Sequence, residues 1–154
     1  MANLFEEFRT VVRVLTGAGV PYAVCGGIAM SVHAQPRATV DIDLLAPSDA
    51  VAMIVSALAP FGFLRRMATP TQLAGGAVTM HRLTKIVAGD PDVLVLDIIE
   101  ARPGATAIAW ETRTSAEWEG YSVTVVSRAG LIGMKRLRGS AQDVADIALL
   151  EQRE

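Results

Sequence analysis

The sequence predicts an α/β (α+β) fold, in which one mixed β-sheet is flanked by helices and followed by short C-terminal helices. Segments with the helical repeat of apolar residues are interspersed with short apolar runs of strand length. Gly and Pro mark most of the boundaries between these segments. Two consecutive helical segments end the sequence, so helices and strands do not alternate strictly.

The first half of the sequence divides into five elements. Gly17 and Gly19 end the first helix, and Pro36 ends the second because the residue before a proline disfavours the helical conformation. Ser48 is the expected N-cap of the third helix. The predicted elements are a helix over 3–19, a strand over 20–26, a helix over 28–35, a strand over 38–46 and a helix over 47–62.

The second half is predicted to be richer in strands. Clusters of Gly, Pro, Asp and Thr predict turns over 69–76 and 88–92. The segment 101–120 fits neither a helix nor a strand pattern alone. The remaining predicted elements are strands around 63–68, 77–87, 92–99 and 121–127, and helices over 128–138 and 141–153.

The composition is that of one globular domain, expected to span residues 1–154. Hydrophobic residues make up 51% of the sequence and charged residues 19%, which excludes an intrinsically disordered chain and allows an enclosed site. The formal net charge of −2 gives no overall basic field. Broad nucleic-acid binding is therefore not expected.

The cysteine and hydropathy patterns indicate a soluble protein of the cytoplasm. Cys25 is the single cysteine, so no internal disulfide can form, and it is expected to be a small buried residue in a reducing compartment. The N-terminal residues lack a signal pattern. No apolar run approaches the roughly 20 residues that span a bilayer, so no membrane association is expected.

Two aspartates of the strand predicted over 38–46 form the first candidate site. Since side chains alternate between the faces of a strand, Asp41 and Asp43 share one face, about 6–7 Å apart. The same face carries Arg37 and Thr39. Two carboxylates this close repel unless a cation lies between them, and their oxygens suit Mg²⁺ or Mn²⁺. The alternative is a solvent-facing or strand-end Asp-x-Asp pair without a ligand.

Two neighbouring features strengthen the metal interpretation. Gly26 and Gly27 lie between a predicted strand and a helix, where phosphate oxygens can approach backbone N–H groups, although a plain tight turn is the alternative. Asp97 is a lone carboxylate in the apolar run VLVLDII, where an unpaired charge is costly to bury. Its alternatives are a strand-end aspartate or a salt-bridged core aspartate. Together these features predict a two-metal phosphoryl-transfer site.

These residues carry a resemblance to a known family. The run GGIAMSVHAQPRATVDIDL over 26–44 resembles the signature of the nucleotidyltransferase (polymerase-beta-like) superfamily. It is most similar to the small bacterial AbiEii-toxin-like and antibiotic-nucleotidyltransferase-like members. The stretch LIGMKRLRGSAQDVADIALL over 131–150 is similar to the family's closing segment, and Ala34 stands where relatives often have Gly. With the strand at 93–99, the resemblance touches residues 22–45, 93–99 and 126–150.

The resemblance implies a fold and a set of roles. The fold would be nucleotidyltransferase-like. Asp41 and Asp43 would bind both metal ions, Mg²⁺ or Mn²⁺, and Asp97 would bind the catalytic ion and accept the proton of the acceptor hydroxyl. Backbone N–H groups of Gly26 and Gly27 would hold the β- and γ-phosphates of an NTP such as ATP.

Three side chains are further candidates for phosphate binding. Ser31 lies one helical turn after the glycine pair, unless it is an ordinary helix serine. Arg37 contacts the phosphates or pairs only with Asp41 or Asp43. Lys135, in the basic stretch KRLR, lies near the apolar side of its helix and can reach a triphosphate, unless it belongs to a solvated helix face.

Other polar residues have local explanations. His33 is expected to pack or to form a hydrogen bond rather than to bind a metal. Ser140 and Asp143 have the spacing of a capping box. No partner is evident for His81, and Arg65 with Arg66 offers only positive charge.

Three classes of function fit these residues. The leading hypothesis is a metal-dependent nucleotidyltransferase that transfers an NMP from an NTP to a hydroxyl of a small molecule, a protein or a tRNA end. The second is a nucleotidyltransferase-like regulatory or binding module, such as one component of a toxin–antitoxin pair. A sugar-nucleotide glycosyltransferase or an aspartyl-phosphate phosphatase would leave the glycine pair without a role. The segment after the last predicted strand is short, so a homodimer or a protein partner is expected to complete the acceptor side.

Overall fold

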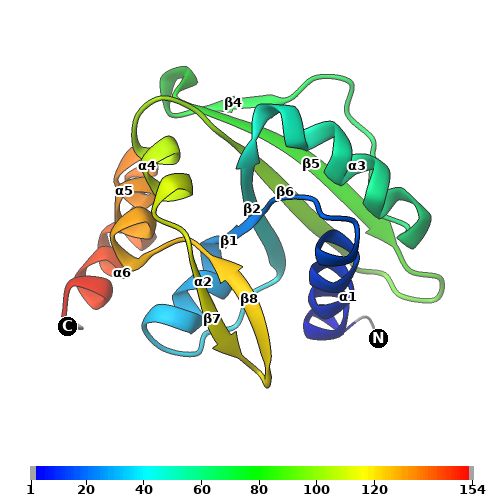
Figure 1. Ribbon diagram of the computed structural model, residues 1–154, viewed down its shortest axis with the longest axis horizontal. Helices are drawn as coiled ribbons and strands as arrows, with labels where there is room; N and C mark the ends of the chain where they lie inside the picture. The colour runs from blue at the N-terminus through cyan, green and yellow to red at the C-terminus, as the bar shows by residue number, and fades with distance from the viewer. Residues whose placement is uncertain (1–2, 153–154) are drawn as a thin grey trace.

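The computed structural model describes residues 3–152, which form six α-helices, three short 3₁₀ turns and one sheet of eight strands (Figure 1). The strands are β1 Ala23–Cys25, β2 Asp41–Pro47, β3 Leu64–Arg65, β4 Thr71–Leu73, β5 Val78–Ile86, β6 Val93–Ala101, β7 Thr114–Trp118 and β8 Tyr121–Val125. The helices are α1 Leu4–Gly17, α2 Gly26–His33, α3 Val51–Leu58, α4 Ala105–Glu111, α5 Arg128–Arg138 and α6 Ala141–Glu151. The 3₁₀ turns are η1 Ser48–Ala50, η2 Ala59–Phe61 and η3 Ala74–Gly76.

The sheet is mixed, as the sequence predicts. Its strand order is β3-β5-β6-β2-β1-β8-β7, and β4 pairs with β5 outside this path. Strands β2 and β6 are parallel neighbours, as are β1 and β8, whereas β1 pairs antiparallel with β2 and β5 pairs antiparallel with β6. The order places β2 and β6 in the middle of the sheet, where both of their edges are hydrogen-bonded.

The helices form two groups around the sheet. Figure 1 shows α1 and α3 together at one side and α4, α5 and α6 together at the other. Helix α4 contacts β2 and β6 as well as α5, and α2 contacts β1, β2, α5 and α6. No helix within residues 3–152 combines the length and the apolarity needed to cross a membrane.

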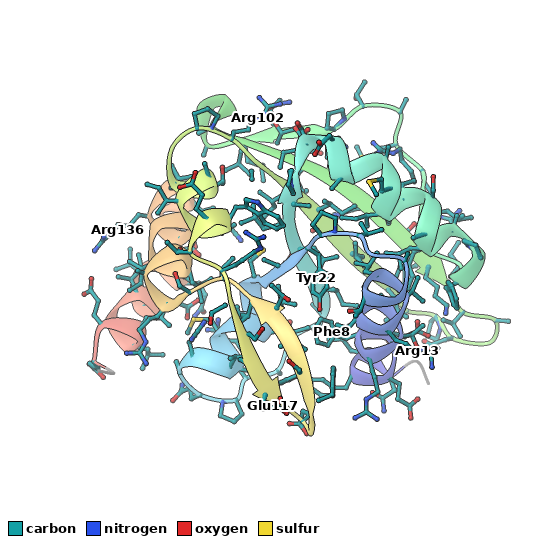
Figure 2. The ribbon with its side chains drawn as sticks, viewed as in Figure 1. Phe8, Arg13, Tyr22, Arg102, Glu117 and Arg136 are labelled. Carbon is teal, nitrogen blue, oxygen red and sulfur yellow. The ribbon has the colours of Figure 1, made fainter. Side chains whose placement is uncertain are left out.

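The core follows the predicted apolar positions. In α1, Phe8, Val11, Val12 and Leu15 are buried, and Asn3 caps the helix by accepting hydrogen bonds from the backbone N–H groups of two first-turn residues. Ile42 and Leu44 of β2 are fully buried, as expected for the apolar face of this strand, whereas Val40, expected on the same face, precedes β2 and is 78% exposed. Figure 2 shows Phe8 directed toward the sheet, whereas Arg13 extends away from it.

Four local predictions were wrong. Ser48 is not a helix N-cap: it begins η1, and α3 follows without a side-chain cap. Strand β2 begins at Asp41 rather than at residue 38, because its pairing with β6 starts there. The predicted turn over 69–76 contains β4 and η3. The strand predicted around 63–68 is reduced to β3.

The ambiguous segment and the chain end have definite outcomes. Residues 101–120 contain the end of β6, then α4 and β7, so a helix and a strand are both present. Helix α6 ends at Glu151, and the predicted helical residue Arg153 lies outside the described residues.

Candidate active site

The register of the central strands brings the predicted carboxylates together. Asp43 lies opposite Asp97 in the parallel β2–β6 pair, Cys25 lies opposite Asp43 on β1, and Arg82 lies opposite Asp97 on β5. We call Cys25, Asp43, Asp97 and Arg82 the central row. Asp41 lies two residues before Asp43 on the same face of β2, and all three aspartates line one pocket of about 330 Å³.

Helix α5 forms the wall that faces this row. Leu131, Met134, Lys135, Leu137 and Arg138 of α5 line the pocket. They occupy three successive turns of the helix, since 3.6 residues make one turn. The carboxylates therefore lie on the sheet, and the basic side chains of the C-terminal segment lie across the pocket from them.

The glycine pair is explained by close packing against β2. Helix α2 begins at Gly26, whose φ of +65° lies in the left-handed region, and a Cβ there would overlap the carboxylate of Asp43. A Cβ at Gly27 would lie 2.7 Å from Oγ1 of Thr39. The two glycines thus let the N-terminus of α2 approach Asp43, and the N-cap residue of α2, Cys25, forms no side-chain cap hydrogen bond.

Asp97 is buried and paired with an arginine. It is 4% exposed, and Arg82 donates from Nε to Oδ1 at 2.8 Å and from Nη2 to Oδ2 at 2.9 Å. The salt-bridged arrangement considered for Asp97 is therefore present. Arg82 was not predicted as a site residue, although alternation in β5 places it on the same face as Met80, and the β5–β6 register places it beside Asp97.

Asp41 and Asp43 carry negative charge that no ion pair within residues 3–152 offsets. Burial first, and then the charges of Asp97 and Asp41, raise the pKa of Asp43 to about 7, while the charges of Arg138 and Lys135 act in the opposite direction. The pKa of Asp41 is also raised, by burial first and then by Asp97. The pocket thus opposes the ionisation of its own carboxylates, which a bound cation would reverse.

The donor chemistry fits a hard divalent cation, because carboxylate oxygens are the ligands that Mg²⁺ and Mn²⁺ prefer. Within residues 3–152, however, no three His, Cys, Asp or Glu side chains are grouped as a metal cluster. Arg82 explains part of this difference, since it takes both oxygens of Asp97. Its side chain is 42% exposed, whereas that of Asp97 is 5% exposed.

Two of the predicted phosphate-binding side chains lie outside the pocket lining. Ser31 donates to the Gly27 carbonyl at 3.3 Å and accepts from the Arg37 backbone N–H at 3.4 Å. Arg37 precedes β2 and donates to both oxygens of Asp146, at 2.9 and 2.6 Å. The expected pairing of Arg37 with Asp41 or Asp43 was wrong, because α6 brings Asp146 closer.

Lys135 lines the pocket, but its ammonium group pairs with two aspartates of α6. It is 7% exposed, so the alternative of a solvated helix face was wrong. Its Nζ donates to Asp146 Oδ2 at 2.8 Å and lies 3.6 Å from Asp143 Oδ1. Asp143 also forms the predicted capping box with Ser140. Asp146 was not predicted as a partner of Lys135, although it lies one helical turn after Asp143.

Asp146 is the best-satisfied carboxylate of this region. It is fully buried and accepts hydrogen bonds from Arg37, Lys135 and Gln142. Burial alone would raise its pKa, but these hydrogen bonds outweigh burial and hold the pKa of Asp146 well below its ordinary value.

Neither histidine lines the pocket. Nε2 of His33 lies 2.6 Å from the Val126 carbonyl oxygen, so His33 forms a hydrogen bond, as predicted. Nδ1 of His81 lies 3.0 Å from Nη1 of Arg65, and burial lowers the pKa of His81. Both imidazoles therefore contact other parts of the protein and not the pocket.

Comparisons with known proteins show the fold. No family model matches the sequence, and no curated protein does. Among solved structures, TM1012 of Thermotoga maritima, a candidate nucleotidyltransferase, superimposes with a TM-score of 0.68 at 14% identity over 97% of this chain and 93% of its own. The aminoglycoside nucleotidyltransferase ANT(2″)-Ia, in complex with adenylyl-2″-tobramycin, gives 0.61 at 12% identity over 96% and 87%.

A third structure, JHP933 from Helicobacter pylori, gives a TM-score of 0.54 at 17% identity over 96% of this chain and 64% of its own. At these identities the similarity concerns the fold. The fold is therefore nucleotidyltransferase-like, as predicted. The two nucleotidyltransferase structures cover nearly the whole chain, so the likeness includes the strands that carry the three aspartates.

Proposed function

We propose that this protein is a metal-dependent nucleotidyltransferase, which transfers an NMP from an NTP to an acceptor hydroxyl and releases pyrophosphate. The observation that carries the proposal is the convergence of Asp41, Asp43 and Asp97 from two parallel strands on one pocket. The fold supports it, and the ANT(2″)-Ia complex contains an acceptor that carries an adenylyl group, which is the kind of product proposed.

The reaction makes and breaks one bond to the α-phosphorus. The acceptor oxygen forms a bond to this phosphorus, and the bond from the phosphorus to the oxygen that bridges to the β-phosphate breaks. The hydroxyl proton passes to the Asp97 carboxylate, which can accept it after Arg82 releases at least one of its oxygens. Mg²⁺ or Mn²⁺, held by Asp41 and Asp43 and joined by Asp97, would neutralise charge on the phosphoryl oxygens.

The basic end of the pocket is assigned to the triphosphate. The N-terminus of α2 at Gly26 and Gly27 offers backbone N–H groups, and Lys135 and Arg138 offer positive charge. Ser31 and Arg37 act indirectly in this proposal, because their polar groups are used by Gly27 and Asp146. Arg37 helps to hold Asp146, which in turn holds Lys135.

The proposal is tested by ligand-induced thermal stabilisation, because a ligand that binds the folded state raises its stability. Each NTP with Mg²⁺ or Mn²⁺ is added to the wild type and to the double variant Asp41→Asn/Asp43→Asn. At least one NTP should stabilise the wild type, and the double variant should fold but lose this increment. The matched control is Asp49→Asn/Asp92→Asn, two exposed aspartates outside the pocket. An undiminished shift in the pocket variant would refute the proposed site.

A second candidate function is favoured by the Arg82–Asp97 pair. Because both oxygens of Asp97 are occupied, the pocket as folded lacks a free third carboxylate. A nucleotide-binding regulatory module, such as one component of a toxin–antitoxin pair, would need no free carboxylate at this position. A partner or a second copy that displaces Arg82 would convert such a module into an enzyme.

A further inference from the structure

The pocket has an apolar section beside the central row. Met80 lies opposite Ile99 in the β5–β6 pair, and Leu73 lies opposite Val78 in the β4–β5 pair. Both Met80 and Ile99 are two residues from the central row along their strands, a distance of about 6–7 Å. With Leu131 of α5, these residues line one continuous part of the pocket, which we call the apolar section.

The apolar section offers almost no polar partner. Thr106 of α4 is the one hydroxyl side chain among the pocket-lining residues within 3–152. It is 2% exposed, accepts from the Arg102 backbone N–H at 2.8 Å and donates to the Arg102 carbonyl at 3.0 Å. Its hydrogen-bonding capacity is therefore used within the protein. The three lining carboxylates are Asp41, Asp43 and Asp97, so no additional negative charge is present for a cationic ligand.

Two basic side chains of α5 line the other end of the pocket. Cys25 and Gly26 mark the β1 side of the central row, and Lys135 and Arg138 line the pocket with them. Both also contact α6, since Lys135 Nζ lies 2.8 Å from Asp146 Oδ2 and Arg138 Nε lies 3.7 Å from Asp143 Oδ2, whereas Arg82 of the central row pairs with Asp97. The apolar section lies on the β5 and β4 side, as the strand order shows. Along α5, Leu131 is one turn before Lys135 and two turns before Arg138.

The geometry of in-line transfer indicates which end of the pocket receives the pyrophosphate and which receives the acceptor. The attacking and leaving oxygens lie on opposite sides of the transferred phosphorus. If the pyrophosphate leaves toward the basic end, the acceptor hydroxyl must approach from the apolar section. We infer that the acceptor of this protein carries its hydroxyl on an uncharged, apolar group, such as a phenol ring, and not on a polyamine. This inference rests on the proposed function and specifies its substrate class. The volume of about 330 Å³ suits a small group of this kind.

The test measures binding of a neutral phenol, N-acetyltyrosinamide, by ligand-observed NMR. The probe is added with and without Mg²⁺ and a non-hydrolysable α,β-methylene analogue of each NTP. We expect the phenol to bind in the presence of the nucleotide analogue that binds. An aminoglycoside, a polyamine that carries hydroxyls, should bind more weakly than the phenol.

The matched variants are Leu73→Asp and Leu64→Asp. Leu73 is 37% exposed in the apolar section, and Leu64 is 41% exposed on β3, outside the pocket; both belong to short strands that pair with β5. Leu73→Asp should weaken phenol binding by about tenfold or more, because it places a charge against the ring, and Leu64→Asp should not. Ile99→Thr is a milder second variant with a weakening of several-fold.

The outcomes separate the inference from the proposed function. If a nucleotide analogue binds and the phenol binds Leu73→Asp more weakly than Leu64→Asp, the proposed function and the acceptor assignment are both supported. Nucleotide binding without this discrimination, a phenol that competes with the nucleotide, or tighter binding of the aminoglycoside overturns the acceptor assignment alone. Absence of binding by any nucleotide analogue overturns the proposed function, and the acceptor assignment with it, whether or not the phenol binds.

Discussion

Asp43 and Asp146 are two carboxylates of the same region with opposite surroundings. Asp43 lies beside two other carboxylates and has no ion-pair partner within the described residues, and its pKa is raised to about 7. Asp146 is fully buried among Arg37, Lys135 and Gln142, and its pKa is lowered. In the part of the chain that the structure describes, Asp43 forms no ion pair, whereas Asp146 accepts hydrogen bonds from three side chains.

This difference separates structural charge from charge that is available to a ligand. A buried carboxylate with a full set of donors contributes to the fold, since removing it leaves its partners unpaired. A carboxylate whose charge the protein does not offset can gain free energy from a bound cation. Asp97 is intermediate, because it is buried but pairs with a single arginine, Arg82, whose side chain is 42% exposed.

The largest expected effect is on stability, in Asp146→Ala. This variant leaves Lys135, which is 7% exposed, without its closest partner and releases Arg37. Unpairing a buried charge should lower the free energy of unfolding by about 3–5 kcal/mol, as measured by urea denaturation. The control is Glu151→Ala on the same helix, whose pair with Arg136 is exposed and should contribute less than about 1 kcal/mol. Equal effects of the two variants would contradict the structural role of Asp146.

The next effect is on turnover, in Asp97→Asn. If Asp97 accepts the hydroxyl proton, transfer should fall by about 10²-fold or more, equivalent to about 2.7 kcal/mol. Nucleotide affinity, measured by calorimetry on the same preparation, should persist through Asp41 and Asp43. Asp92→Asn, an exposed aspartate just before β6, should leave both quantities unchanged. Equal transfer rates in Asp97→Asn and the wild type would favour the regulatory module over the enzyme.

A smaller effect is expected on the packing around Asp43, in Gly26→Ala. Gly26 and Gly75 have nearly the same backbone conformation, with φ of +65° and +64°, but only at Gly26 does an added Cβ meet neighbouring atoms, those of Asp43. Gly75→Ala should therefore show the backbone strain alone, about 1 kcal/mol. Gly26→Ala should destabilise the protein by about 2–3 kcal/mol and weaken stabilisation by NTP and metal. Identical unfolding free energies of Gly26→Ala and Gly75→Ala would show that α2 does not pack closely against Asp43.

The smallest effect is the dependence of stability on acid pH. The folded-state pKa of Asp146 is below its unfolded value, so the unfolded state binds more protons, and stability rises with pH in this range. The contribution of Asp146 is present above about pH 4 and is lost as pH falls, with a slope of at most about 1.4 kcal/mol per pH unit. Asp146→Asn should flatten this slope between about pH 4 and pH 2. The measurement is the free energy of unfolding of both proteins at each pH. An unchanged slope would assign the acid sensitivity to other carboxylates.

Much of the architecture was predictable from local patterns. The apolar face of α1 and the helices at 128–138 and from residue 141 follow the predicted ranges closely, whereas the strand through Asp41 and Asp43 begins three residues later than predicted. The three aspartates were predicted to share one cleft, and they line one pocket. Shorter elements were less predictable, since β3 and β4 contain two and three residues and exist through their pairing with β5.

Residue periodicity alone determined which side chains share a face of one strand or helix, because alternation and the 3.6-residue turn are local properties of the backbone. It therefore placed Asp41 beside Asp43, whereas the glycine pair, predicted to lie between a strand and a helix, forms the first turn of α2. Only the tertiary structure decided the partners: Arg82 for Asp97 through the β5–β6 register, and Asp146 for both Arg37 and Lys135 through the docking of α6. Such ion pairs join residues far apart in sequence, so they depend on strand order and helix packing, which no local pattern specifies.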